Sequence, residues 1–311
     1  MNTQRNLIEE LKYQFNFGGM TVKLIFVNTV VFLFVNVISI LGHLFQDTLI
    51  EEILTLMNQT VFALNTNIGQ LLLTPWGILT SIFAHFEFFH FAINMLMLLV
   101  AGRMFEQLFS GKRLLATYLL GGIIGGAFEI IAHNIFPLFS AVDVSIVGAS
   151  GSNMAIFMAL AFYRPNLEVS IFGIFPLRLI ILAGIFFLVD LLSIDKQDGT
   201  AHFAHIGGAL LGALSIRNLH NSKNIITKFQ VMIEKIATFF KNLLKKNKPK
   251  FTVERGGNAR GGFKTDEEYN YEAKQRQIKV DAILDKIAKS GYESLSKAEK
   301  EFLFKQSQNG K

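Results

Sequence analysis

The sequence predicts an all-α fold, in which six transmembrane helices form a bundle and a helical tail follows in the cytoplasm. Two observations lead to this prediction. Hydrophobic residues make up 51% of the 311 residues, whereas charged residues make up only 17%. The charges are also uneven, because residues 1–217 contain ten of the 30 Lys and Arg residues and the last 94 residues contain the other twenty. An apolar part with few charges is typical of a membrane bundle, and a basic end is typical of a soluble tail beside a membrane.

Six stretches of the sequence are candidates for membrane spans, since a helix needs about 20 mostly apolar residues to cross a bilayer. They are residues 21–41, 79–102, 114–133, 142–162, 172–192 and 201–216. The sixth stretch is short and rich in glycine, so hydropathy alone does not decide whether it spans the membrane.

The loops between these spans predict the orientation of the bundle. Lys and Arg gather before the first span, between the second and third, after the fourth and after the sixth, whereas the other loops hold mainly acidic residues. By the positive-inside rule, both termini then lie in the cytoplasm. The expected location is a cell membrane of the bacterial inner-membrane type, which the chain crosses several times.

Composition predicts the remaining boundaries. We expect a cytoplasmic segment at 1–20, the membrane domain at 21–217, a basic amphipathic membrane-proximal helix at 218–250, a linker at 251–265 and a cytoplasmic helical hairpin at 266–311. Ser296 and Glu299 have the spacing of a capping box in that hairpin. Because the basic residues gather in the tail, the net charge of +6 does not indicate nucleic acid, and the expected partner of this tail is the anionic surface of the lipid bilayer. The absence of cysteine excludes thiol catalysis and Cys-based zinc sites.

A candidate nucleophile lies in the sequence Gly148-Ala149-Ser150-Gly151, inside the fourth apolar stretch. Small residues around one hydroxyl fill lipid-facing space poorly, but they allow a backbone to approach closely and to adopt strained angles. The N–H groups at the start of the following helix point back at the serine, where they could hold an oxyanion. The alternative is that these small residues only pack helices together in the membrane.

Histidines in two other spans supply the remaining polar groups. His90 and Asn94 are four residues apart, so they share one face of a helix in the second span and suit a pocket that stabilises negative charge. In the sixth span His205 lies one turn before Gly208, and Gly208 and Gly212 form a small-xxx-small face. If that face packs against the fourth span, His205 can exchange a proton with Ser150.

These three motifs, in this order and on these spans, resemble the rhomboid family of intramembrane serine proteases. The resemblance covers roughly residues 20–217. It implies a serine endopeptidase with Ser150 as nucleophile and His205 as general base, without an acid, and with His90 and Asn94 in the oxyanion hole. It further implies that the substrates are transmembrane proteins, cut in or near the membrane. Gly148, Gly151, Gly208 and Gly212 are then packing residues, and no metal or cofactor is needed.

The sequence departs from the family at two positions. Trp76 is followed by Gly77 where the family often has arginine, and Met154 stands where the family often has an aromatic residue packed against the histidine. Asp190 lies in the fifth span, but no motif directs it to His205. His85 and His202 are interpreted as packing or hydrogen-bonding residues.

Two other functions remain open at this point. A histidine-lined metal transporter would use His85, His90, His202 and His205, but it would not explain the motif around Ser150; the zincin motif H-E-x-x-H is absent. A catalytically weak or inactive rhomboid-like protein that binds transmembrane helices would be expected to lack Ser150 or His205. The sequence carries no signal for the oligomeric state.

Overall fold

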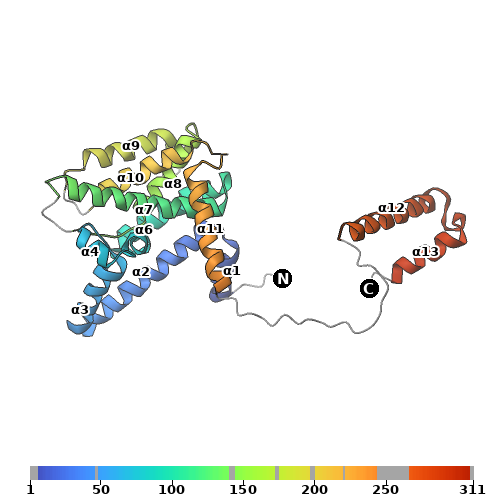
Figure 1. The fold of residues 1–311 in the computed structure, drawn as a ribbon, viewed down its shortest axis with the longest axis horizontal. Coiled ribbons are helices and arrows are strands. Elements are labelled where there is room, and N and C mark those ends of the chain that lie inside the picture. Colours follow the sequence, from blue (N-terminus) through green and yellow to red (C-terminus); the bar gives the residue numbers. More distant parts are fainter. Residues whose placement is uncertain are drawn as a thin grey trace. The chain divides into compact units, whose positions relative to one another are not determined.

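The structure is a computed structural model, and it describes residues 6–45, 48–139, 144–171, 175–196, 200–219, 221–243 and 266–308. The chain divides into two compact units, Met1–Lys246 and Asn247–Lys311. The predicted linker at 251–265 and the end of the predicted amphipathic helix at 244–250 lie outside the described residues. The described part is mostly helical, with two short antiparallel pairs of strands (Figure 1).

The helices of the first unit are α1 (Leu7–Phe17), α2 (Gly19–Phe45), α3 (Thr48–Met57), α4 (Ile68–Leu73), α5 (Gly77–Thr80), α6 (Phe88–Leu108), α7 (Gly111–Ile135), α8 (Ser150–Tyr163), α9 (Leu179–Leu192), α10 (His202–Ser215) and α11 (Ile225–Leu243). Short turns of other helix types, η1 (Asn58–Phe62) and η2 (Ser81–Phe83), lie between α3 and α6. The strands are β1 (Leu64–Asn65), β2 (Ser145–Ile146), β3 (Glu168–Ile171) and β4 (Phe175–Arg178).

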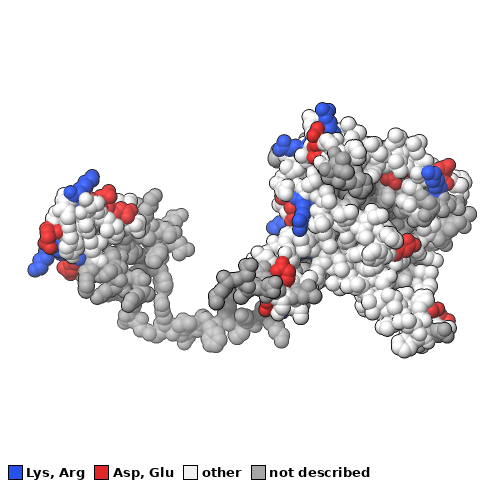
Figure 2. All heavy atoms as spheres, turned by 180° about the vertical axis from the view of Figure 1, so that it is seen from behind, with Lys and Arg blue, Asp and Glu red and all other residues white. Residues whose placement is uncertain are grey.

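Among the described residues, three helices are long and apolar enough to cross a membrane, namely α2, α6 and α7. A fourth apolar helix, α9, is shorter. Many large side chains on α2 and α9 are exposed although they are hydrophobic, as expected of a surface that faces lipid. Figure 2 shows a broad face of this unit that consists mainly of uncharged side chains. The protein is therefore a membrane protein with several membrane-spanning helices.

Two of the predicted spans differ from the structure at their start. The second predicted span, 79–102, is helical in α6 only from Phe88, because the residues before it form the short turns α5 and η2 and an irregular segment. The fifth predicted span, 172–192, is wrong at its start. Residues 175–178 form strand β4, which pairs with β3 from Glu168↔Arg178 to Ile171↔Phe175, and the helix begins at Leu179.

The centre of the first unit is formed by α7, α8 and α10, which pack against one another. Helix α8 is enclosed by its neighbours, and its residues from Gly151 to Ala161 are all buried. Helices α2 and α6 pack together beside this centre, and α9 contacts α8 and α10. The helix that begins at Ser150 is thus held on several sides.

Hydrogen bonds also join α2 to α6 and α7 to the segment before α11. The carboxylate of Glu106, on α6, accepts hydrogen bonds from the backbone N–H groups of Met20 (2.7 Å) and Thr21 (2.9 Å), at the start of α2. A helix start has unpaired N–H groups and a partial positive charge, so this carboxylate stabilises it. In the first turn of α7, Arg113 donates to the side chain of Asn224 (3.0 Å), just before α11.

The second unit contains α12 (Asp266–Ser290), η3 (Tyr292–Ser294) and α13 (Lys297–Gln308). The capping box predicted at the start of α13 is present. Glu299 accepts a hydrogen bond from the backbone N–H of Ser296 (2.7 Å), and the backbone N–H of Glu299 donates to the hydroxyl of Ser296 (3.3 Å). Lys286 on α12 donates to the same carboxylate at 3.0 Å, which joins the two helices.

Candidate active site

Ser150 is the first residue of α8, and the loop before it is held by three contacts. Gly148 has φ of +130°, a conformation that side chains disfavour, and a Cβ at this position would lie 2.8 Å from the His90 ring. Its N–H donates to the backbone oxygen of Ser81 (2.9 Å). The N–H of Ala149 donates to Nε2 of His85 (3.2 Å), so His85 supports the loop. The loop that leads to the serine is therefore held against the His90 ring.

Helices α8 and α10 are in backbone contact beside this serine. A Cβ on Gly208 would lie 2.1 Å from the backbone oxygen of Gly151, and a Cβ on Gly212 would lie 2.3 Å from that of Ala155. A Cβ on Gly151 would lie 3.1 Å from the backbone oxygen of Ala204. Ala204 directly precedes His205, just as Gly151 directly follows Ser150. This close packing of two glycine-rich faces places Ser150 and His205 at neighbouring ends of α8 and α10.

A cavity of about 850 Å³ opens at this place. The structure puts all four polar side chains singled out in the sequence on its wall, namely those of His90, Asn94, Ser150 and His205. Met154 also lines the cavity. The four glycines lie behind the wall, where the helices and the Ser150 loop touch.

Asp190, on α9, contacts the imidazole of His205. Nδ1 of His205 lies 2.8 Å from Oδ1 of Asp190, and Nδ1 of His202 lies 2.9 Å from the same oxygen. Nothing in the sequence placed Asp190 here, and the expectation of a histidine without an acid partner is wrong for this structure. A carboxylate only accepts hydrogen bonds, so the contact selects the tautomer with hydrogen on Nδ1. Nε2 of His205 is then left with a lone pair.

Asn153 is a second residue that the sequence analysis missed. Its amide nitrogen donates to the backbone oxygen of Asn94 (3.0 Å) and to the side-chain oxygen of Asn94 (2.9 Å). The amide nitrogen of Asn94 donates to the backbone oxygen of His90 (2.9 Å). Because Asn153 occupies the oxygen of the Asn94 amide, the orientation of that amide is fixed, and its second N–H remains as a donor.

Comparison with known proteins identifies this part of the chain. The model of the Rhomboid domain family matches residues 73–222. The chain contains a Rhomboid domain. A second family model, described as a family of unknown function (DUF6576), matches residues 264–309.

Three curated proteins are similar to the part that contains the Rhomboid domain. Rhomboid protease AarA of Providencia stuartii is 32% identical over 162 residues, which are 48% of this chain and 58% of that protein. RHOMBOID-like protein 12, mitochondrial, of Arabidopsis thaliana is 28% identical and is matched over 44% of each chain. Inactive RHOMBOID-like protein 8 of Arabidopsis thaliana is 31% identical over 43% of this chain and 35% of that protein. The chain thus spans between about a third and three fifths of the length of these relatives, of which one is named a protease and another is named inactive.

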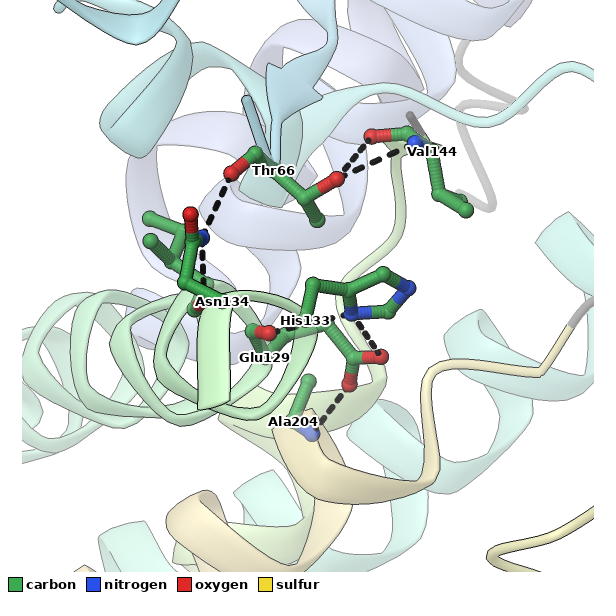
Figure 3. Close-up of polar contacts among 7 residues, drawn as sticks. Thr66, Glu129, His133, Asn134, Val144 and Ala204 are labelled. Atoms are coloured by element: carbon green, nitrogen blue, oxygen red, sulfur yellow. Dashed lines mark hydrogen bonds and ion pairs between the residues drawn. The ribbon is translucent and has the colours of Figure 1, made fainter. Parts of the chain in front are cut away.

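The Rhomboid domain also contains a buried carboxylate that fixes the start of α10 (Figure 3). Oε2 of Glu129, on α7, accepts a hydrogen bond from the backbone N–H of Ala204 at 2.9 Å. Nδ1 of His133 lies 3.5 Å from Oε1 of the same carboxylate. Glu129 and His133 line the cavity as well. Since Ala204 directly precedes His205, this contact ties the backbone beside the histidine to α7, whereas Asp190 on α9 contacts its imidazole.

The segment between η1 and α5 is tied to the segment that leads to Ser150. Strands β1 and β2 pair, with Leu64↔Ile146 and Asn65↔Ser145. Thr66 exchanges hydrogen bonds with the backbone of Val144, and Asn134 on α7 donates to the backbone oxygen of Thr66 at 3.0 Å (Figure 3). Gly77 fits into this loop because a Cβ there would lie 2.4 Å from the backbone oxygen of Ala63. The residue after Trp76 is thus part of the loop packing.

Proposed function

We propose that the protein is an intramembrane serine endopeptidase that cleaves transmembrane proteins in or near the membrane. The observation that carries the proposal is the shared cavity, on whose wall Ser150, His205, His90 and Asn94 lie together. The six proposed spans are α2, α6, α7, α8, α9 and α10. Both termini are cytoplasmic, in a membrane of the bacterial inner-membrane type, by the distribution of Lys and Arg.

In the proposed reaction, Ser150 attacks the carbonyl carbon of the scissile peptide bond. Nε2 of His205 accepts the hydroxyl proton and then donates it to the leaving amine. Asp190 acts as a positioning residue, since its contact with Nδ1 keeps the lone pair on Nε2. Water then attacks the acyl-enzyme, with His205 again as the base, and this frees Ser150.

The oxyanion that forms on the carbonyl oxygen needs hydrogen-bond donors. His90 and Asn94 supply these donors in the proposal, together with the backbone N–H of Ser150. His90 lies against Gly148, two residues before the nucleophile. Losing one such donor typically lowers the rate about 10²–10³-fold, so Asn94→Ala should reduce cleavage strongly without abolishing it.

The test is cleavage of a single-span reporter protein in liposomes by the wild type, Ser150→Ala and His205→Ala. We expect cleavage by the wild type alone. The same three proteins are also treated with a fluorophosphonate, and its covalent labelling is measured. A fluorophosphonate reacts with activated serines irrespective of the natural substrate. Labelling of the wild type but not of Ser150→Ala supports the enzyme. If neither cleavage nor labelling occurs, the alternative holds, and the protein binds transmembrane helices without cutting them.

A further inference from the structure

The cluster of Asp190, His202 and His205 has the composition of a metal site. Among the described residues, it is the group of three acidic or imidazole side chains whose ligand atoms all lie within 4.8 Å of one another. Its side chains are largely buried, with exposed fractions of 11%, 8% and 18% in the order given. The group also lines the cavity of about 850 Å³, which offers access to an ion and room for a water molecule.

The chemistry of the three ligands favours Zn²⁺. Two imidazole nitrogens and one carboxylate oxygen are ligands that zinc takes in tetrahedral sites, and three protein ligands leave the fourth position open. Zinc–ligand bonds of about 2.0–2.2 Å separate neighbouring ligand atoms by roughly 3.3–3.5 Å. The two nitrogens now lie 2.8 and 2.9 Å from the carboxylate oxygen. Each nitrogen–oxygen pair would widen by about half an ångström to admit the ion, and the two nitrogens, which lie within 4.8 Å of each other, would move to the same separation.

We propose that Asp190, His202 and His205 bind Zn²⁺, and that the bound ion switches off the proposed protease. The ion is thus an inhibitor and not a cofactor. The binding follows from the ligand cluster alone, whereas the inhibition rests on the proposed function.

Inhibition follows from the two nitrogens of one imidazole. While Nδ1 of His205 carries hydrogen and faces Asp190, Nε2 has the lone pair that can accept the proton of Ser150. Zinc on Nδ1 takes the place of that hydrogen, and the neutral ring then carries its hydrogen on Nε2. The ring loses the hydrogen on Nδ1 and gains one on Nε2, so the number of protons that it carries does not change. In this form Nε2 is only a donor, so the zinc-bound histidine cannot act as the base.

The binding is tested by titrating the full chain, purified in detergent with an affinity tag that contains no histidine, with Co²⁺. Cobalt takes the same ligands as zinc and absorbs visible light strongly in tetrahedral sites, and the chain has no cysteine to compete. We expect the wild type to bind one ion with this absorption and His202→Gln to lose it. The matched control is His43→Gln, because His43 is an exposed histidine whose Nε2 lies 3.8 Å from the carboxylate of Glu51. It should titrate like the wild type. Absence of the absorption in the wild type, or its persistence in His202→Gln, overturns the site.

The inhibition is tested by adding Zn²⁺ to the cleavage assay and then removing it with a chelator. For each protein, the cleavage rate with Zn²⁺ is compared with the rate of the same protein without metal. We expect the wild type to lose at least nine tenths of its rate, with kcat reduced and KM unchanged, and to recover with the chelator. His202→Gln should need at least about tenfold more Zn²⁺ for the same loss, since one ligand of three is gone. Cobalt binding without loss of cleavage would overturn the inhibition. If the wild type never cleaves, the proposed function fails, and the cobalt titration still decides the site.

Discussion

One oxygen of Asp190 faces two imidazoles, and this contact shows what single residues contribute to the site. Ser150 and His205 could be predicted because each belongs to a short motif with its own glycines. Asp190 could not, since it lies on a different helix, 15 residues before His205, and no periodicity relates the two positions. Asn153 was missed for a related reason. An asparagine three residues after Ser150 matches no motif by itself. Its role depends on the contact with Asn94, which lies on another helix.

Gly148→Ala should abolish or nearly abolish cleavage. The substitution adds a Cβ to a residue with φ of +130° and places it 2.8 Å from the His90 ring, so either the loop or the ring must move. The measurement is the cleavage rate together with the melting temperature. Gly184→Ala, on α9, is the matched control, because a Cβ there meets nothing within 4 Å. A Gly148→Ala protein that cleaves like the control would contradict the role of this loop.

Asn153→Ala should lower kcat about tenfold or more while KM changes little. Without Asn153 the Asn94 amide is free to rotate, so part of the donation to the oxyanion is lost, and a whole lost donor costs about 10²–10³. The control is Asn36→Ala, on α2, whose amide bonds the backbone oxygen of Phe32 in its own helix. An equal loss in both variants would point to general destabilisation instead of a role in the site.

At the scale of elements, the sequence predicted which segments are helical better than where they begin. The fifth span is the clearest case. Residues 175–178 are as apolar as a membrane helix at most positions, and hydropathy does not distinguish a short apolar strand from the start of a helix. Pairing with β3 decides the matter, and hydropathy does not encode which residues pair. By contrast, the capping box at Ser296 is a local signal and was predicted correctly.

The helix start at Ser296 should become less stable in acid. Hydrogen bonds from the Ser296 backbone N–H, from Lys286 and from the Ser296 hydroxyl lower the pKa of Glu299 from 4.5 to about 2. A carboxylate with a lowered pKa contributes stability above its unfolded pKa, and this contribution is lost as the pH falls from about 4.5 toward 2. Hydrogen exchange of α13, corrected for the intrinsic rate, should therefore quicken over this range.

Glu299→Gln provides the comparison for this pH dependence. The amide keeps the size of the side chain but does not titrate, so exchange in α13 should be faster than in the wild type near neutral pH and should change less on acidification. Parallel curves for the two proteins would show that Glu299 does not stabilise this helix start.

At the scale of the whole molecule, the cavity and its supports lie within the first unit. The residues that line it fall between Phe86 and His205. Helix α11 packs on α7, with Ile226 fully buried and a contact of 2.8 Å between Lys112 and Glu234. The catalytic chemistry proposed for the chain therefore needs the first unit, including α11, and makes no use of α12 and α13.

Two truncations test this division. A chain that ends at Lys246 should cleave a reporter in detergent within about twofold of the full chain. A chain that ends at Arg217 should melt at a lower temperature, because it exposes the surface that Ile226 covers and leaves Arg113 without the side chain of Asn224. Loss of cleavage after the first truncation would assign the second unit a part in the reaction.

The lengths of the three helices that carry Ser150, Asp190 and His205 have a consequence for the surrounding lipid. Each has 14 residues, which corresponds to about 21 Å, whereas the hydrocarbon layer of a bilayer is about 30 Å thick. The peptide groups at the ends of such helices need hydrogen-bond partners that acyl chains do not provide. Either the layer thins around this part of the molecule or solvent fills the difference. In both cases these proposed spans bring water to the depth of the serine, where the proposed hydrolysis requires it.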